Sequence, residues 1–327
     1  WFDYLRARER GIAVDGLAIF VPAGRERGAC LRVRWLDSSL AQFRVYAYGE
    51  GHETEIDLHD YGNVDTEVPP RRSPAGGQRS DADKILDALA AIPEVEIIET
   101  SDQARSIRVR GLEFAREREG RLTFGLETKR SAITSNTAEL IALARQLGYV
   151  RAPGAEQHGE LYQRQPELWL ESQVRRNVSE IDASLRPAPI YGQVPALAGG
   201  ERGIIDLLAT DHCGRLAVLE LKATEDPHLP LQALDYWLRV RWHLERDEFT
   251  AKGYFPGVQL RKDPPRMLLI APALNFHPST DAVLRYFSPA IEVERIGVGM
   301  DWRSDLRTMF RIRGSDTLRF EEEGTNA

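Results

Sequence analysis

Charged side chains stand inside two apolar segments of this sequence, where they are costly to bury unless they meet one another or a metal ion. Asp206 lies within GIIDLLA (203–209), and Glu220 and Lys222 lie within RLAVLELKA (215–223). Both segments are typical of strands, and because strand side chains alternate between faces, Glu220 and Lys222 share one face. Two acids and a lysine could bind a divalent cation and stabilise charge on a phosphate group. They could also form a buried ion-pair cluster.

The turn between the two strands decides whether these groups meet. A three-residue loop over 212–214, with its glycine in the left-handed conformation, pairs Asp211 with Arg215. Counting along both strands, that register pairs Asp206 with Glu220. A two-residue loop would place the two carboxylates on opposite faces of the sheet. The position of the glycine favours the three-residue loop, so we expect the carboxylates to lie together.

Lysine is rare in this chain. Only five of the 43 basic residues are lysine, and the other 38 are arginine. Where the chain needs only a positive charge it usually has arginine, so the lysine at position 222 indicates a specific role.

A long helix is expected shortly after these strands, over 229–246. Gln232 and Tyr236 lie one helical turn apart on it, and Arg239 and His243 extend the same stripe. The stripe borders an apolar ridge, so it could face a polar active site. A solvated helix face explains it as well.

A second expected helix, over 166–185, precedes the strands. Its core ridge contains Val174, and Glu171 sits at the edge of that ridge, one turn before Val174. Glu171 is therefore a candidate third carboxylate. It could equally be an exposed acid that the dipole at the start of the helix favours.

The order of these elements resembles the PD-(D/E)xK phosphodiesterase superfamily. The resemblance covers roughly 160–300 and rests on a helical glutamate, GIIDLL, LELK and QALDY, which contain Glu171, Asp206, Glu220, Lys222, Gln232 and Tyr236. The Gln-xxx-Tyr element is similar to that of the RecB-like nuclease branch, and GIIDLLATDHCGRLAVLELK is similar to the catalytic hairpin of NucS-like endonucleases. One departure is Ile205, which stands where the superfamily motif has proline.

The resemblance implies a restriction-endonuclease-like fold and a site for Mg²⁺ or Mn²⁺. Its metal ligands would be Asp206, Glu220, the Leu221 carbonyl and, in support, Glu171. Lys222 would orient the attacking water and stabilise developing charge. Gln232 and Tyr236 would position Lys222 or the substrate phosphate.

The rest of the chain is expected to form separate packing units. The predicted division is a β-rich region at 1–68, a linker at 69–81, a small α+β region at 82–150, a linker at 151–165 and the nuclease-like domain at 166–327. The first region is expected to be antiparallel, with ACLRVRWL (29–36) as one of its strands. In the second, we expect a strand over 105–117 and a helix over 136–147 that ends before Gly148. The nuclease-like domain follows an α/β pattern with a mixed sheet flanked by helices.

The net charge and the lengths of the apolar runs limit the classes of function that the sequence allows. The net charge of −7 argues against a protein coated in positive potential but leaves room for local basic strips. Candidate strips are Arg108 with Arg110, Arg311 with Arg313, and the loop RKDPPR (261–266), which could track a DNA backbone or form solvated strand faces. No apolar run is long enough to span a membrane and no leader is visible, so we expect a cytoplasmic protein without membrane contact.

The leading hypothesis is a metal-dependent nuclease that hydrolyses nucleic acid, DNA in preference, in repair, recombination or defence. The N-terminal half would recognise the substrate, a protein partner or a second copy of the chain. The main alternative is a non-catalytic nucleic-acid-binding or assembly module on the same fold. A third is a phosphodiesterase that acts on a small nucleotide. Metal binding separates the first hypothesis from the second, because a binding module needs no metal.

Overall fold

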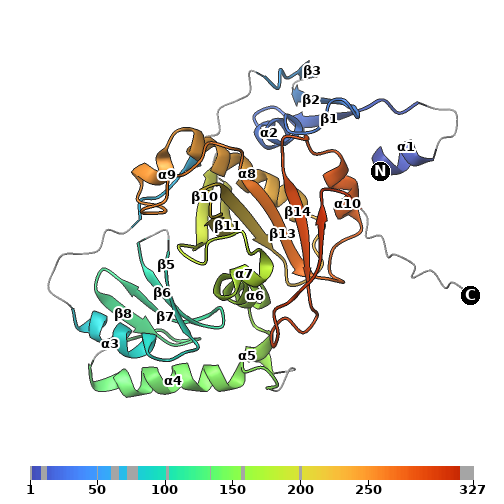
Figure 1. Cartoon of the computed structure of the whole chain (residues 1–327). Helices are drawn as coiled ribbons and strands as arrows, with labels where there is room; N and C mark the ends of the chain where they lie inside the picture. Colours follow the sequence, from blue (N-terminus) through green and yellow to red (C-terminus); the bar gives the residue numbers. More distant parts are fainter. Residues whose placement is uncertain are drawn as a thin grey trace, which may run out of the picture.

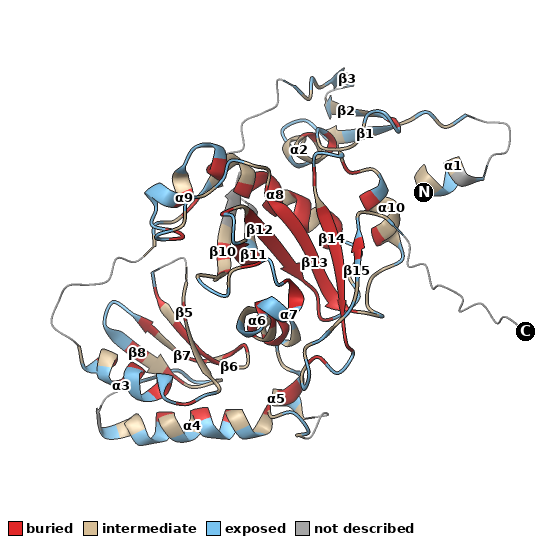
Figure 2. Ribbon diagram, viewed as in Figure 1, coloured by how far each residue is buried: buried red, intermediate tan, exposed pale blue. Residues whose placement is uncertain are grey.

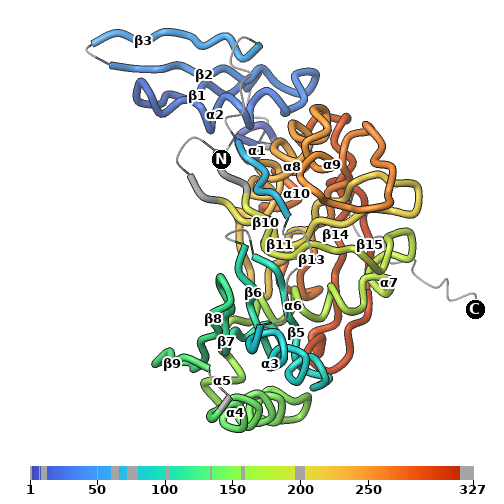
Figure 3. The backbone as a smooth tube through the Cα atoms, turned by 90° about the vertical axis from the view of Figure 1, so that its left-hand side faces the viewer, coloured from blue at the N-terminus to red at the C-terminus, as the bar shows by residue number. Residues whose placement is uncertain are grey.

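The computed structural model describes residues 2–8, 13–49, 51–59, 66–71, 80–100, 103–132, 134–155, 159–198 and 201–316. They form a mixed α/β structure with sheets of three, seven and five strands. The three-stranded sheet lies at one end of the molecule and the five-stranded sheet at the other, with the seven-stranded sheet between them (Figure 1 and Figure 3). The α/β class expected from the sequence is confirmed. The predicted domain boundaries stay predictions, and residues 72–79 of the first predicted linker lie outside the described residues.

The seven-stranded sheet has the order β15-β14-β13-β12-β11-β10-β4. Strands β12, β13 and β14 run parallel, and the other pairs are antiparallel, so the sheet is mixed as expected. The three parallel strands are buried along their whole length (Figure 2), because helices cover both faces. The strands are β4 (Thr66–Glu67), β10 (Tyr191–Ala198), β11 (Glu201–Thr210), β12 (Leu216–Leu221), β13 (Arg266–Pro272), β14 (Val293–Val298) and β15 (Thr308–Arg313).

Helices α6 (Pro166–Arg176) and α7 (Val178–Ile181) pack on one face of this sheet. Helices α8 (Leu229–Glu245) and α10 (Ser279–Arg285) pack on the other, and α9 (Glu248–Ala251) follows α8. The single helix expected over 166–185 is wrong, because the chain breaks at Asn177. The Asn177 side chain donates to the Gln173 carbonyl at 3.0 Å, which ends α6 with a local hydrogen bond in place of a further helical turn.

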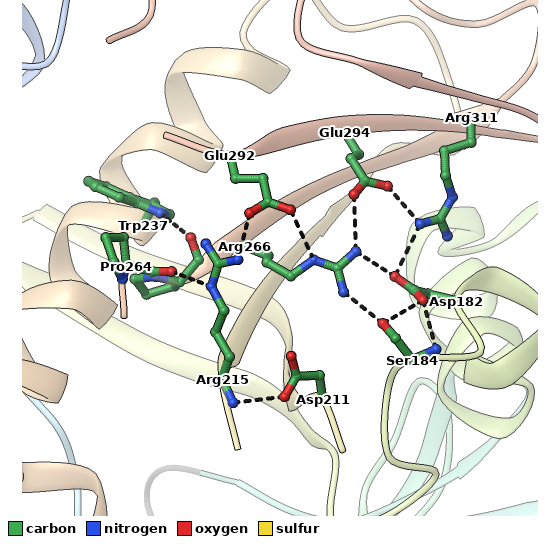
Figure 4. A network of polar contacts seen from close by, with 11 residues as sticks. Asp182, Ser184, Asp211, Arg215, Trp237, Pro264, Arg266, Glu292, Glu294 and Arg311 are labelled. Atoms are coloured by element: carbon green, nitrogen blue, oxygen red, sulfur yellow. Dashed lines mark hydrogen bonds and ion pairs between the residues drawn. The ribbon is translucent and has the colours of Figure 1, made fainter. Parts of the chain in front are cut away.

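Ion pairs connect the amino ends of the parallel strands β13 and β14 (Figure 4). Arg266 at the start of β13 contacts Asp182 at 2.6 Å and Glu294 of β14 at 3.1 Å. Arg311 of β15 contacts the same two carboxylates at 3.2 Å and 2.6 Å. The network therefore fixes the amino ends of these strands and leaves their carboxyl ends, where ligands bind in open α/β sheets, for other side chains.

The five-stranded sheet is antiparallel and has the order β5-β6-β7-β8-β9. The single strand expected over 105–117 is wrong, because Arg110 and Gly111 form a two-residue hairpin turn, with φ of 45° and 81°. Gly111 is required there, since a Cβ would lie 2.2 Å from the backbone of Leu168 in α6. The strands are β5 (Val95–Glu99), β6 (Arg105–Val109), β7 (Leu112–Arg118), β8 (Arg121–Phe124) and β9 (Arg130–Ser131).

Helices α3 (Asp81–Ala90) and α4 (Thr137–Val150) pack against this sheet through a shared apolar cluster, and the short helix η1 (Thr134–Asn136) leads into α4. The expected end of α4 before Gly148 is wrong, because the helix continues through that residue to Val150. A glycine within a helix costs about 1 kcal/mol, which the packing of the apolar face outweighs.

The segment predicted as a linker at 151–165 is packed where the structure describes it. It contains α5 (Glu160–Gln163) and the wholly buried Arg151. The guanidinium of Arg151 donates to the carbonyls of Leu161, Arg164 and Arg110, and it lies over the Trp169 ring at 4.4 Å. The described residues of this segment therefore contact both the five-stranded sheet and α6.

The N-terminal sheet contains β1 (Gly16–Pro22), β2 (Gln42–Gly49) and β3 (His52–Glu55), and α1 (Phe2–Ala7) precedes it. The expected antiparallel arrangement is wrong for β1 and β2, which run parallel. The strand expected at 29–36 is also wrong, because α2 (Arg27–Val33) connects them. Cys30 and Val33 of α2 pack against the sheet, while Leu31 of α2 and Trp35, two residues after the helix, pack against the cluster that contains α8.

Candidate active site

The hairpin between β11 and β12 has the predicted register. The Asp211 N–H donates to the Arg215 carbonyl at 2.9 Å, and Gly214 has a φ of +87° in the three-residue loop. Leu207 pairs with Leu219, so the next step of the register places Asp206 opposite Glu220 on one face. The register expected from the position of the glycine is confirmed.

Asp206 lies where the two strands begin to part. Its Oδ2 accepts a hydrogen bond from the Leu221 N–H at 2.8 Å. The pKa of Asp206 is raised to about 7, chiefly by burial. The charges of Glu171 and Glu167 contribute to this increase, whereas the hydrogen bond from Leu221 and the charge of Lys222 oppose it. The carboxylate form of Asp206 is therefore costly unless a further positive charge comes close.

Glu220 is more deeply buried, with 1% of its surface exposed. Neither of its carboxylate oxygens accepts a hydrogen bond. Burial and the neighbouring charge of Asp206 raise its pKa well above the usual value, and Lys222 at 3.5 Å from Oε1 offsets only part of this. Two adjacent carboxylates, of which Glu220 has no hydrogen-bond donor, are suited to share a cation.

Lys222 provides a positive charge beside these carboxylates. Its Nζ lies 3.5 Å from Glu220 Oε1 and 3.6 Å from Asp226 Oδ2, and the side chain is buried. Burial disfavours the ammonium, but the surrounding carboxylates outweigh burial and raise the pKa of Lys222. The lysine is therefore protonated at neutral pH.

Gln232 and Tyr236 contact each other as their spacing predicts. Gln232 Nε2 donates to the Tyr236 hydroxyl at 3.0 Å, and the Ile204 N–H donates to the same oxygen at 3.3 Å. Because Ile204 lies two residues before Asp206, the tyrosine ties α8 to the strand that carries the carboxylate. Arg239 of the predicted stripe lines a pocket of about 300 Å³ with Gln232 and Tyr236, whereas His243 contacts Glu248 and Thr66.

Glu171 of α6 is bound by protein groups. It accepts a hydrogen bond from Gln193 Nε2 at 2.7 Å and lies 3.4 Å from Arg175 and 3.8 Å from Arg108. Its charge raises the pKa of Asp206, so it belongs to the surroundings of the site. Its role in supporting a metal stays a prediction. Gly192 makes room for it, because a Cβ there would lie 2.5 Å from Glu171 Oε1.

Glu167 is a residue that the sequence reasoning missed. It lies one turn before Glu171 on α6, it is exposed, and its charge acts on Lys222, Asp206 and Glu220. The spacing of four residues before Glu171 could have identified it, since residues four apart share a helix face.

The donors available to a cation are all oxygen. Asp206 and Glu220 are the two carboxylates, and oxygen ligands are those that Mg²⁺ and Mn²⁺ prefer. Within the described part of the chain, no three His, Cys, Asp or Glu side chains form a metal-ligand group. A bound cation would therefore complete its coordination with the Leu221 carbonyl, water or substrate.

The basic strips predicted to follow DNA are largely engaged within the protein. Arg110 lies in the hairpin turn, so it does not share a strand face with Arg108, and it donates to the Arg151 carbonyl at 2.5 Å. Arg311 belongs to the ion-pair network of Figure 4. Lys262 of the 261–266 loop donates to the Leu244 carbonyl at 2.8 Å near the end of α8. These side chains stabilise the fold.

No helix in the described part of the chain is both long enough and apolar enough to cross a membrane. No model of a known family matches the chain, and a search of the curated proteins gives no match.

Proposed function

We propose that this chain is a metal-dependent nuclease of the restriction-endonuclease-like fold that hydrolyses phosphodiester bonds with Mg²⁺ or Mn²⁺. The observation that carries the proposal is the pairing of Asp206 with Glu220. Both carboxylates have raised pKa values, and the buried oxygens of Glu220 accept no hydrogen bond. The mixed sheet, its β11–β12 hairpin and the helices on both faces support the same proposal.

The chain's own residues have distinct parts in this reaction. Asp206 and Glu220 would hold the cation, which when bound stabilises negative charge on the phosphate and lowers the pKa of water. The ammonium of Lys222 would hold the attacking water by hydrogen bonding and stabilise charge that develops on the phosphate oxygens. Its raised pKa keeps it protonated for that role.

The second layer of residues keeps these groups in place. The Leu221 N–H fixes one oxygen of Asp206, and Tyr236 fixes the backbone two residues earlier. Asp226 forms a second ion pair with the Lys222 ammonium, beside that with Glu220. Groups held in this way need little reorganisation during the reaction.

A cleavage assay on the full chain tests the proposal. Labelled single-stranded, duplex and forked DNA, with matching RNA, would be incubated with Mg²⁺, Mn²⁺ or EDTA. We expect cleavage of at least one substrate with metal and none with EDTA, and Glu220→Gln should abolish it. Metal-independent binding without any cleavage would favour the non-catalytic module, and cleavage of small phosphodiesters alone would favour a nucleotide phosphodiesterase.

A further inference from the structure

A second polar pocket lies at the start of α6, on the side of the five-stranded sheet. Its volume is about 290 Å³. Arg108, Lys129 and Arg164 line it, together with a single carboxylate, Glu113, so cationic side chains outnumber anionic ones three to one. Gln165, the residue before the first residue of α6, also lines the pocket. The lining therefore favours an anionic ligand.

Arg108 is the best indication that a ligand belongs here. Its side chain is 93% buried, yet its Nη1 has no hydrogen-bond acceptor. Its Nε donates to Ser106 Oγ at 2.9 Å, and Glu171 lies 3.8 Å from Nη1, which is too far for a hydrogen bond. A buried guanidinium N–H without an acceptor is costly. Because Arg108 lines the pocket, an anion bound there would bring compensating negative charge close to this guanidinium.

The other two cations have weak or exposed partners. Lys129 Nζ lies 3.9 Å from Glu113, and Arg164 contacts Glu127, whose side chain is 80% exposed, at 2.8 Å. Exposed ion pairs contribute little, so an incoming anion can replace them. Lys129 is also one of only five lysines in the chain.

The start of α6 adds to the positive potential. This helix has eleven residues, begins with Pro166, and the side chain of its preceding residue Gln165 makes no capping hydrogen bond. The free N–H groups and the dipole of a helix N-terminus favour an anion, a phosphate above all.

We propose that this pocket binds a phosphate group of the nucleic-acid strand that the active site cleaves. The assignment to a strand rests on the proposed nuclease function. Helix α6 connects the pocket with that site. Arg108 contacts Glu171, whose charge reaches Asp206, and Glu167 follows Gln165 by two residues and acts on Lys222. The pocket would thus give the five-stranded sheet a role in holding the strand.

The phosphate could come from a strand end or from within the strand, and binding assays on the full chain distinguish these sources. Labelled single strands with a 5′-phosphate, a 3′-phosphate or hydroxyl ends would be titrated in EDTA, with inorganic phosphate as competitor. The test variant is Lys129→Gln/Arg164→Gln. The control, Arg118→Gln/Arg130→Gln, removes two exposed arginines of the same sheet that do not line the pocket.

We expect the test variant to bind strands about tenfold more weakly and to lose competition by inorganic phosphate, while the control variant behaves as the parent. Loss confined to one type of phosphorylated end identifies a terminal phosphate, and an equal loss for all three strands identifies an internal one. Equal binding by parent and test variant, with both folded by thermal melting, would overturn the inference.

The same variants separate this inference from the proposed function. If the parent cleaves nothing but the test variant loses strand binding, the pocket stands and the nuclease proposal fails. If the parent cleaves and the test variant binds strands as tightly as the parent, the nuclease proposal stands and the pocket inference fails.

Discussion

The carboxylate of Asp206 and the backbone N–H of Leu221 form a hydrogen bond of 2.8 Å between two strands at the point where they begin to part. Leu221 lies between Glu220 and Lys222, so this bond orients the Asp206 carboxylate from the same strand that carries Glu220. An asparagine at position 206 can accept the same bond through its carbonyl oxygen, so Asp206→Asn removes the charge and retains the geometry.

We expect Asp206→Asn to stabilise the metal-free protein at alkaline pH. The pKa of Asp206 is about 7 in the folded protein against 3.8 for the free group, so the folded state retains a proton that the unfolded state loses between these values. Stability of the parent therefore falls as pH rises through this window. Near pH 8 the variant should be more stable by on the order of 2 kcal/mol, and near pH 4 the difference should vanish. Urea unfolding at both pH values, in EDTA, measures this; equal stability near pH 8 would contradict it.

Lys222→Ala should abolish hydrolysis while Mn²⁺ binding persists. The carboxylates hold the cation, whereas the ammonium acts on the water and the phosphate. The positive charge of the ammonium repels a metal ion, so its removal should not weaken metal binding. Asp206→Asn should lose both metal binding and hydrolysis. Calorimetric Mn²⁺ titration beside the cleavage assay separates the two, with Lys84→Ala, which changes an exposed lysine of α3, as control. Cleavage by Lys222→Ala at the parent rate would make the lysine a structural ion-pair partner.

The two glutamates of α6 should respond differently to neutral substitution. Glu171→Gln leaves the buried Arg108 and the partly buried Arg175 with less compensating charge, which should destabilise the fold by about 3 kcal/mol. Glu167 is exposed, so Glu167→Gln should leave stability unchanged and lower hydrolysis about 10- to 100-fold through its effect on Lys222. Thermal melting and kcat compare them. A Glu167→Gln variant that is destabilised but fully active would contradict the role in hydrolysis assigned to Glu167.

Gly214→Ala should weaken the catalytic hairpin. Gly214 has a φ of +87°, and a Cβ there would lie 2.1 Å from the Gln259 carbonyl oxygen. Gly257→Ala is a matched control, because Gly257 has a φ of +76° with open space around it. We expect the Gly214 variant to be less stable than the control by about 1–3 kcal/mol, with a loss of metal affinity as the register loosens. Equal unfolding midpoints would show that the close contact is without consequence.

The hairpin could be predicted from sequence because its determinants are local. A single glycine after His212-Cys213 fixes the loop length, the loop fixes the register, and alternation then places Asp206 and Glu220 on one face. The contact between Gln232 and Tyr236 follows from helical spacing in the same way.

Features that depend on distant packing could not be predicted in this way. The alternation of Leu31, Val33 and Trp35 is typical of a strand, but each of these residues has a partner outside α2 that makes the helix the better solution. The turn at Arg110 and Gly111 carries no proline or asparagine, and its close approach to α6 becomes visible only in three dimensions. Two partners of Glu171 come from β6 and β10, which are remote from α6 in sequence.

Helix α6 contacts both the central seven-stranded sheet and the five-stranded sheet. One side carries the apolar ridge of the central sheet, and its polar residues Glu171, Ser172 and Arg175 contact Arg108 and Glu96 of the five-stranded sheet. A shortened chain that begins at α6 would retain Glu171, Ser172 and Arg175 but lack their partners Arg108 and Glu96. The two sheets are therefore coupled through one side of α6, and a deletion of the five-stranded sheet would require compensating substitutions at these positions.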